Sequence, residues 1–141
     1  MPSVIRLPGG NPEVVKGLET ASETYKAGDP VGFTSGYVVV GTGGAIKGIA
    51  RGDASGVADT PCEVELIDAN ALYVVNYKAA ATSQALVGDV VDFNFSGTAG
   101  NFLVDESAAS TDCYVVALDS RDPVTTSGGR LIVRFLYSNF T

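Results

Sequence analysis

Histidine and tryptophan are absent from the sequence, methionine occurs once and cysteine twice. Without histidine, the chain lacks the usual general base, the usual metal ligand and the base partner of Ser-His and Cys-His nucleophiles. This absence argues against an enzyme more strongly than any other feature of the sequence. We therefore expect no catalytic residue, no metal site and no cofactor.

Long apolar runs and clusters of basic residues are also missing. No run approaches the roughly 20 residues that a membrane-spanning helix needs, and the N-terminus, MPSVIRLPGG, has no apolar stretch of signal-peptide length. The nine Lys and Arg are dispersed and the formal net charge is −7, so the average field repels nucleic acid and anionic membranes. We expect a protein made in a cytoplasm that binds neither nucleic acid nor membrane.

The residues that are abundant favour β-structure. The chain has 141 residues, 45 % of them hydrophobic, which is enough for one domain with a real core. Val and Ala dominate and Gly occurs 17 times, as in pleated strands joined by tight turns. The only competing helical signal, residues 79–86, is too short to change the class.

Short alternating or β-branched runs, separated by turn residues, recur from residue 29 onward. The predicted strands lie within residues 29–33, 37–40, 45–50, 62–66, 72–77, 90–95, 113–118 and 131–137. Residues 72–77 are apolar on both faces as far as Asn76, which is typical of a central strand or of half an interface. The sequence thus predicts an all-β fold: a single small β-barrel or sandwich of short antiparallel strands with an extended N-terminal arm.

The last predicted strand has two different faces. Leu131, Val133, Phe135 and Tyr137 share one face, while Arg130, Ile132, Arg134 and Leu136 share the other. A face that combines arginines with large aliphatic residues is more typical of a subunit contact than of a free surface. We therefore name Arg134 as a candidate contact residue.

Residues 1–24 form the predicted arm, and residues 25–141 form the β-domain. Pro2, Pro8 and Pro12 would interrupt the hydrogen-bond ladder of a strand within residues 1–24, which indicates an extended segment. Such a segment is either a frayed terminus or a clamp that orders on a neighbouring subunit. Its apolar residues favour the clamp, so we name Val4, Ile5, Leu7 and Val14 as candidate contacts. Deletion of residues 1–18 should then leave a folded protein that binds its partner less well.

The turn after residues 113–118 brings opposite charges together. Its sequence, Asp119-Ser120-Arg121-Asp122-Pro123, has a local ion pair as its ordinary interpretation. A contact to a neighbouring subunit is the sharper alternative, because loops often carry binding residues. On the basis of this alternative, we name Arg121 and Asp122 as candidate contact residues.

Two carboxylate patterns and the two cysteines have ordinary structural interpretations. Glu63 and Glu65 fall on one face of a strand, opposite apolar residues, as a solvated face does. The segment Asp92–Gly97 begins like a calcium loop but has Leu103 where the bidentate Glu is required. Cys62 and Cys113 each begin an alternating run, where a free buried thiol is expected, although the two strands could be neighbours.

The order of turns and strands resembles that of a known family. The relevant segments are Tyr25-Lys26-Ala27-Gly28-Asp29-Pro30-Val31, Ile46-Lys47-Gly48-Ile49-Ala50, Val87-Gly88-Asp89-Val90-Val91, Cys113-Tyr114-Val115-Val116-Ala117-Leu118 and Gly129-Arg130-Leu131-Ile132-Val133-Arg134-Phe135. Over about residues 25–137 this sequence looks like the capsid cement, or decoration, proteins of tailed bacteriophages, in which similar Gly-Asp turns and strands recur in this order.

The resemblance implies a structural protein of the virion. Its members are β-barrel-like, commonly homotrimeric, and sit on the capsid exterior where copies of the major capsid protein meet, stabilising the shell. The partners implied are the major capsid protein and further copies of this chain, with a dimer as the alternative to the trimer. The main rival interpretation is a phage tail or fibre-associated module, including a carbohydrate-binding module that would use Tyr37, Tyr73 and Tyr77.

Overall fold

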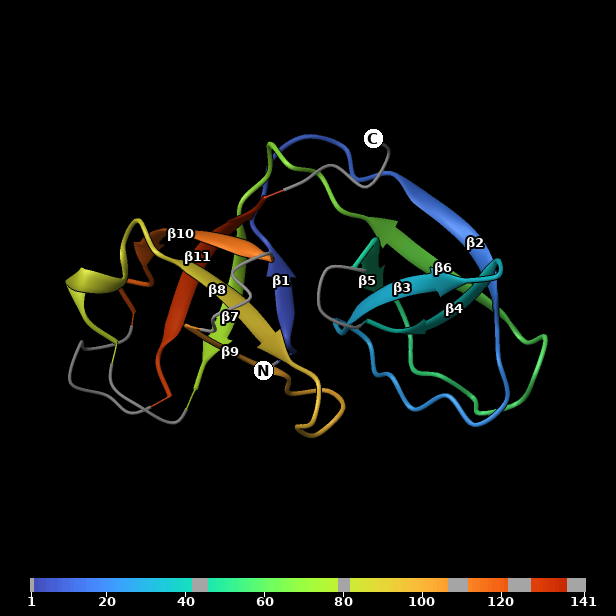
Figure 1. Cartoon of the computed structure of the whole chain (residues 1–141). Helices are drawn as coiled ribbons and strands as arrows, with labels where there is room; N and C mark the ends of the chain where they lie inside the picture. Colours follow the sequence, from blue (N-terminus) through green and yellow to red (C-terminus); the bar gives the residue numbers. More distant parts are fainter. Residues whose placement is uncertain (1, 42–45, 79–81, 107–111, 122–127, 137–141) are drawn as a thin grey trace.

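The computed structural model describes residues 2–41, 46–78, 82–106, 112–121 and 128–136. Within these residues the structure is almost entirely strand, and the only helix is the short 3₁₀ turn η1 (Gln84–Leu86). The strands form two small closed barrels that lie side by side (Figure 1). The predicted all-β class is confirmed.

One barrel is built from five consecutive strands in the order β2-β4-β3-β5-β6. We call it the inserted barrel, because the other barrel is formed by strands that precede and follow it in the sequence. Its strands are β2 (Val14–Glu19), β3 (Pro30–Thr34), β4 (Tyr37–Val40), β5 (Gly48–Ala50) and β6 (Pro61–Leu66). All pairings are antiparallel except that of β2 with β4, which is parallel. Alternate residues face inward, and Val31, Val38 and Val64 fill the interior without exposure to solvent.

The flanking barrel is formed by the strands on either side of this insertion. They are β1 (Val4–Arg6), β7 (Tyr73–Tyr77), β8 (Val90–Asn94), β9 (Leu103–Asp105), β10 (Cys113–Leu118) and β11 (Arg130–Phe135). The sheet order is β1-β7-β11-β10-β8-β9, and a parallel pairing of β7 with β9 closes the ring. All five residues of β7 are buried, so the predicted central strand is confirmed.

The N-terminal segment is extended, as predicted, but it lies within the two barrels. β1 pairs with β7, while β2 pairs with β6 along its whole length up to Leu18. Pro2, Pro8 and Pro12 flank these strands and do not interrupt them. Deletion of residues 1–18 would remove β1 and almost all of β2, so it would not leave the folded protein that the clamp hypothesis assumed.

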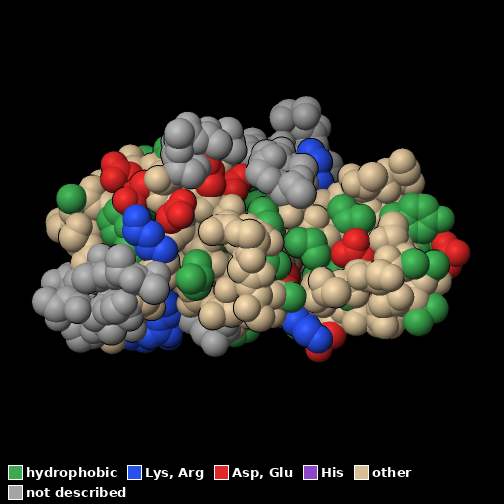
Figure 2. All heavy atoms as spheres, turned by 60° about the horizontal axis from the view of Figure 1, so that its bottom comes forward, with side chains coloured by type: hydrophobic (Ala, Val, Ile, Leu, Met, Phe, Trp, Pro, Cys, Tyr) green, Lys and Arg blue, Asp and Glu red, His purple; other side chains and the backbone are tan. Residues whose placement is uncertain are grey.

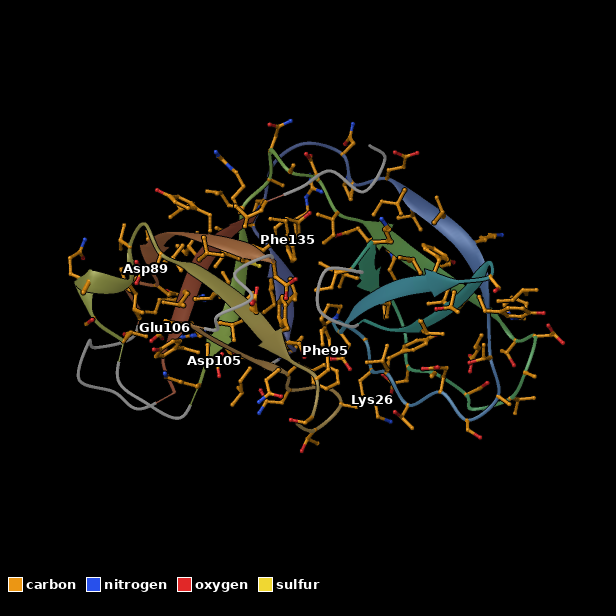
Figure 3. All side chains as sticks on the ribbon, viewed as in Figure 1. Lys26, Asp89, Phe95, Asp105, Glu106 and Phe135 are labelled. Atoms are coloured by element: carbon orange, nitrogen blue, oxygen red, sulfur yellow. The ribbon has the colours of Figure 1, made fainter. Side chains whose placement is uncertain are left out.

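Each barrel has its own apolar cluster, and the cluster of the flanking barrel extends to residues of the inserted barrel. Ile46, Ile49 and Ile67 leave the inserted barrel and join the core of the flanking barrel. In the other direction, Phe95 projects from the end of β8 toward the inserted barrel (Figure 3), where its ring lies close to Gly41. Burial of these large side chains between the barrels fixes one barrel against the other.

A buried carboxylate adds polar contacts to this junction. Asp29 has no exposed surface and accepts hydrogen bonds from Ser3 Oγ at 2.6 Å, Lys26 N at 2.9 Å and Gly100 N at 2.8 Å. Ser3 Oγ in turn accepts a bond from Phe102 N at 2.8 Å. The N-terminal segment, the turn before β3 and the loop before β9 are therefore joined at one side chain.

Candidate functional site

The predicted contact residues of the N-terminal segment occupy different environments. Val4 is 3 % exposed and packs in the core of the flanking barrel, so its selection as a contact residue was wrong. Its side chain is buried because it faces inward opposite Val75 of the central strand. Ile5 and Val14 are 39 % and 37 % exposed, but they lie on different barrels. Leu7 is partly exposed just after β1.

The outer face of the flanking barrel carries two rows of residues that include exposed apolar side chains. In one row Ile5 lies opposite Val74, which is 1 % exposed, and Val74 lies opposite the partly exposed Ile132; in the next row Arg134 lies opposite Tyr114. Tyr114 is 42 % exposed, and Leu136, just beyond β11, is 46 % exposed. We call Ile5, Tyr114, Ile132, Arg134 and Leu136 the outer strip.

The predicted alternation of β11 is confirmed where the structure describes it. Leu131, Val133 and Phe135 are at most 2 % exposed, whereas Arg134 and Leu136 are exposed. Tyr137, the last residue predicted for the inward face, lies outside the described residues. The strip thus contains two of the predicted contacts, Ile5 on β1 and Arg134 on β11, which lie on the same barrel and are separated by β7.

Arg134 is available for an intermolecular ion pair. Its side chain is exposed, and among the described residues no carboxylate lies within ion-pair distance of its guanidinium. Arg130, at the other end of β11, is instead 3.9 Å from Asp119. The outer strip is therefore apolar with one uncommitted positive charge, on a protein of net negative charge.

The structure supports the local ion-pair interpretation of the charged turn. Arg121 Nε donates to both carboxylate oxygens of Asp119, at 2.9 and 3.1 Å, and the Arg121 backbone N donates to Oδ1. Asp119 is nearly buried, whereas the Arg121 side chain is 61 % exposed. Hydrogen bonds from Arg121 lower the pKa of Asp119 from 3.8 to about 2. Asp122 lies outside the described residues.

This ion pair predicts an acid-dependent contribution to stability. Because the pKa of Asp119 is lower in the folded protein, its contribution is complete above pH 4 and is lost as the pH falls toward 2. Replacing Asp119 with asparagine should cost about 1 kcal/mol at pH 7, a value reduced by solvent around Arg121, and almost nothing at pH 2. Urea unfolding at both pH values measures this difference; an equal cost at each pH would contradict it.

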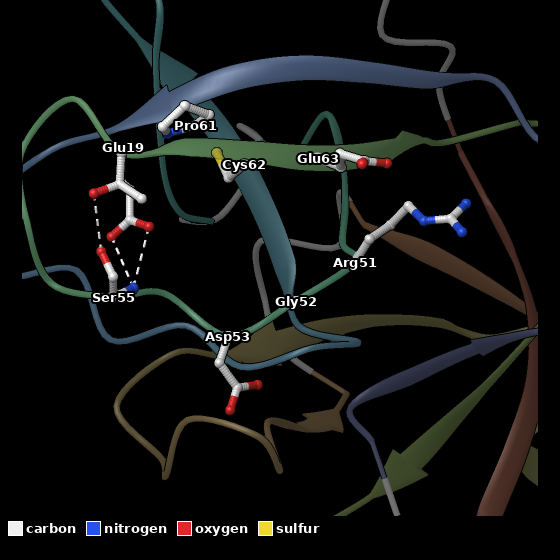
Figure 4. A pocket seen from close by; sticks show the side chains of 9 residues that line it. Glu19, Arg51, Gly52, Asp53, Ser55, Pro61, Cys62 and Glu63 are labelled. Atoms are coloured by element: carbon white, nitrogen blue, oxygen red, sulfur yellow. Dashed lines mark hydrogen bonds between the residues drawn. The ribbon is translucent and has the colours of Figure 1, made fainter.

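A cleft opens on the inserted barrel beside the turn that follows β5 (Figure 4). It has a volume of about 470 Å³ and is lined by Glu19, Arg51, Gly52, Asp53, Ser55, Thr60, Pro61, Cys62 and Glu63. Glu19 is not free to react there, because its buried carboxylate accepts hydrogen bonds from Ser55 N at 3.0 Å and Gly56 N at 2.9 Å. The Glu19 carboxylate therefore holds the loop that contains Ser55 and Gly56 in place, and this structural role accounts for its burial.

Both cysteines are free thiols, as predicted, but only Cys113 is buried, whereas Cys62 is partly exposed. Cys62 lies on β6 of the inserted barrel and Cys113 on β10 of the flanking barrel, so they are not on neighbouring strands. Burial raises the pKa of Cys113 well above its ordinary value, which makes that thiol unreactive. The Tyr25 hydroxyl is also buried, and its pKa is raised mainly because of that burial and also by its interaction with the Cys62 thiol.

Two of the tyrosines considered for a sugar platform are in the core. Tyr73 is fully buried and Tyr77 is 3 % exposed, which leaves Tyr37 as the only one of the three that is partly accessible.

Hydrophobic side chains on the face shown in Figure 2 form small groups between charged ones. Glu63 and Glu65 point away from buried Val64 and Leu66, as predicted for a solvated face.

Sequence reasoning missed Tyr114 as a surface residue of the strip. The signal was present, because alternation along residues 113–118 places Tyr114 opposite the buried Cys113 and Val115. It also missed Asp29 and Arg6. Asp29 was predicted only as the first residue of a strand. No local pattern shows that the side chain of Asp29 or of Arg6 is surrounded by loops distant in sequence.

Within the described ranges, no group of three or more His, Cys, Asp or Glu side chains is arranged to hold a metal ion. In the same part of the chain, no helix has the length and apolarity needed to cross a bilayer. The chain matches no protein-family model, no curated protein and no solved structure.

Proposed function

We propose that this protein is a capsid cement, or decoration, protein that binds the outside of a bacteriophage head through the outer strip. The observation that carries the proposal is the strip itself, where Tyr114, 42 % exposed, lies opposite Arg134 and Leu136, 46 % exposed, follows two residues later. Among the described residues no carboxylate lies within ion-pair distance of the Arg134 guanidinium. Exposed aromatic and aliphatic residues beside an arginine have the composition of a binding surface. The partner is the major capsid protein.

The architecture is suited to that role. A shell contact requires a rigid surface repeated by symmetry and does not require catalysis. Most of the strip lies on the hydrogen-bonded strands β10 and β11 of the flanking barrel. The junction residues Ile46, Ile49 and Ile67 and the Asp29 carboxylate fix that barrel to its neighbour. Self-association into a homotrimer, with a dimer as the alternative, is part of the proposal and would multiply the contacts made by each assembly.

Co-sedimentation with expanded phage heads that lack decoration tests the proposal. The double variant Tyr114→Ser, Arg134→Glu removes one apolar contact and reverses the charge beside it. We expect it to bind about 100-fold more weakly, because two central contact residues together contribute about 3 kcal/mol. Its thermal unfolding should be nearly unchanged, since both side chains are exposed.

The chain offers a matched control on the other barrel. Lys16 and Leu18 lie on the outer face of β2, and Leu18 is 40 % exposed. The variant Lys16→Glu, Leu18→Ser therefore makes the same chemical changes away from the strip and should bind normally. Equal weakening by both variants would remove the strip from the proposal, and absence of saturable binding by the unmodified protein would refute the function.

A further inference from the structure

The two barrels are built on the same plan. Each is a ring in which the first strand pairs with the third, the third with the second, the second with the fourth, and the fourth with the fifth. The rings are β2-β4-β3-β5-β6 and β7-β9-β8-β10-β11. In both, the pairing of the first strand with the third is parallel and the others are antiparallel. The flanking barrel is therefore a structural repeat of the inserted barrel, with β1 as an additional strand.

The repeat extends to individual hydrogen bonds. Before β3, Gly28 N donates to Ala50 O at 2.8 Å, and Ala50 N donates to Asp29 O at 2.9 Å. The same two bonds occur before β8, both at 2.9 Å, from Gly88 N to Val115 O and from Val115 N to Asp89 O. Both glycines have a positive φ, +89° and +95°. The two barrels can therefore be compared position by position.

This comparison places Lys16 of β2 at the position of Val74 of β7. Leu18 pairs with the first residue of β4, and Asn76 pairs with the first residue of β9, so Leu18 corresponds to Asn76. On β7, Val74 lies opposite Ile5 of β1. Leu7 N donates to Leu72 O at 2.9 Å, and bonded pairs alternate along an antiparallel ladder, so Ile5 and Val74 form the next bonded pair.

The main chain of Lys16 points away from β6. Leu66 N donates to Glu13 O at 2.8 Å, and the same alternation makes Val15 and Gly17 the next residues of β2 that bond to β6. The N–H and C=O of Lys16 are therefore directed to the opposite side of β2. This is the side on which β7 holds β1 in the flanking barrel.

No described strand pairs with Lys16 on that side. β4 pairs with β2 only at Leu18 and Glu19, which lie beyond Lys16 along the strand. We call the unpaired side of residues 15–17 the β2 edge. It presents one free N–H and one free C=O at the position where the equivalent groups of Val74 bond to β1.

An inward-facing aromatic ring is exposed beside the β2 edge. Phe33 lies opposite the buried Val38, and its Cε1 would be 3.6 Å from a Cβ atom on Gly17. Phe33 is nevertheless 38 % exposed, whereas Phe93, its equivalent in the flanking barrel, is 6 % exposed. The apolar interior of the inserted barrel is thus open to solvent next to the unpaired strand.

We propose that the β2 edge accepts an extended strand from another protein, which pairs antiparallel with β2 as β1 pairs with β7. Main-chain hydrogen bonds to Lys16 hold such a strand, in the manner of β-augmentation. β1 defines the required chemistry: its Val4 faces inward opposite Val75, the equivalent of Gly17. The donated strand therefore carries an apolar residue opposite Gly17, where it covers Phe33, and no proline opposite Lys16.

The β2 edge is a second interaction surface, separate from the outer strip. It belongs to the inserted barrel, whereas the strip belongs to the flanking barrel. Its occupation can therefore be measured without phage heads.

A synthetic peptide of residues 2–8, which contains the β1 sequence, is the probe. Hydrogen exchange at the Lys16 amide, followed by NMR, reports strand pairing. We expect this amide to exchange freely in the protein alone and about tenfold more slowly with the peptide at ten times its Kd. The same peptide with Ile5→Pro is the matched control, because it lacks the N–H that faces the acceptor strand, and should give no protection.

Two substitutions at Lys16 test the same hydrogen bond from the protein side. Lys16→Ala keeps the main-chain N–H, whereas Lys16→Pro removes it without breaking a bond to β6. The alanine variant should bind the labelled peptide within twofold of the unmodified protein, and the proline variant about tenfold more weakly. Thermal unfolding reports whether each variant is folded, and the Ile5→Pro peptide tests the bond on the unmodified protein.

Three outcomes would overturn the proposal. Protection of the Lys16 amide without peptide would show that the chain fills this edge itself. Equal binding of the two peptides would show that no strand pairing occurs. A dimer that is lost in Lys16→Pro would show that the β2 edges of two copies pair with each other.

Discussion

Replacing Gly48 with alanine should destabilise the inserted barrel by about 3 kcal/mol, the upper part of the usual range for overpacking a core. A Cβ atom on Gly48 would lie 2.3 Å from Val64 Cγ1 and 2.7 Å from the backbone oxygen of Glu65. Neither neighbour can move easily, because Val64 is fully buried and Glu65 is held in the pairing of β5 with β6. The melting temperature should fall by roughly 10 °C.

Gly52→Ala is the matched control for this substitution. It lies four residues further along the chain, where a Cβ atom would meet nothing within 4 Å. Its melting temperature should stay within about 2 °C of the unmodified protein, as for most exposed substitutions. If Gly48→Ala melted at the same temperature as Gly52→Ala, the close packing of β5 against β6 described above would be wrong.

Loss of the Asp29 carboxylate should have an effect of at least similar size. Asp29→Ala would leave Ser3 Oγ, Lys26 N and Gly100 N without their acceptor in a buried site. Removing a buried charged acceptor costs about 3–5 kcal/mol. We expect a large decrease in urea midpoint and faster hydrogen exchange at the amides of Lys26 and Gly100.

Asp53→Ala is the control for Asp29. Asp53 also accepts a backbone hydrogen bond, from Ala27 N at 2.9 Å, but its side chain is 61 % exposed. The expected cost is below about 1 kcal/mol, because water can replace the lost acceptor. Similar costs for the two substitutions would show that the Asp29 network does not join the barrels in the way its geometry indicates.

Most strands from β3 onward were predictable from sequence, whereas β1, β2 and β9 were not predicted. The inward face of β11 followed from residues two apart on one strand, and the burial of β7 followed from a run that is apolar on both faces as far as Asn76. Strand β2 was not predicted, because Gly17 interrupts the apolar pattern of its sequence. That glycine is required, since a Cβ atom there would lie 2.6 Å from Val38 Cγ2 inside the barrel.

The pairing of strands was not predictable by the same means. Nothing in the sequence near Val4 shows that it lies beside Val75, and without that pairing it resembles an exposed residue of a free arm. The two parallel pairings, β2 with β4 and β7 with β9, also join strands that are not neighbours in sequence. Arg134 was found from local alternation and Ile5 from the apolar residues of the N-terminal segment. Alternation also placed Tyr114 on the outer face, although it was not selected, whereas the surroundings of Arg6 depend on the assembled barrels.

The insertion of one barrel between β1 and β7 imposes an order on folding during synthesis. The inserted barrel uses only residues 14–66, so all its strands are present once this part of the chain has left the ribosome. β1 is synthesised first, yet its partner β7 begins only at residue 73, and closure of the flanking barrel also needs β11. β1 therefore stays unpaired until β7 has been made, after the whole inserted barrel, and the outer face that contains Ile5 is completed only when β11 is available.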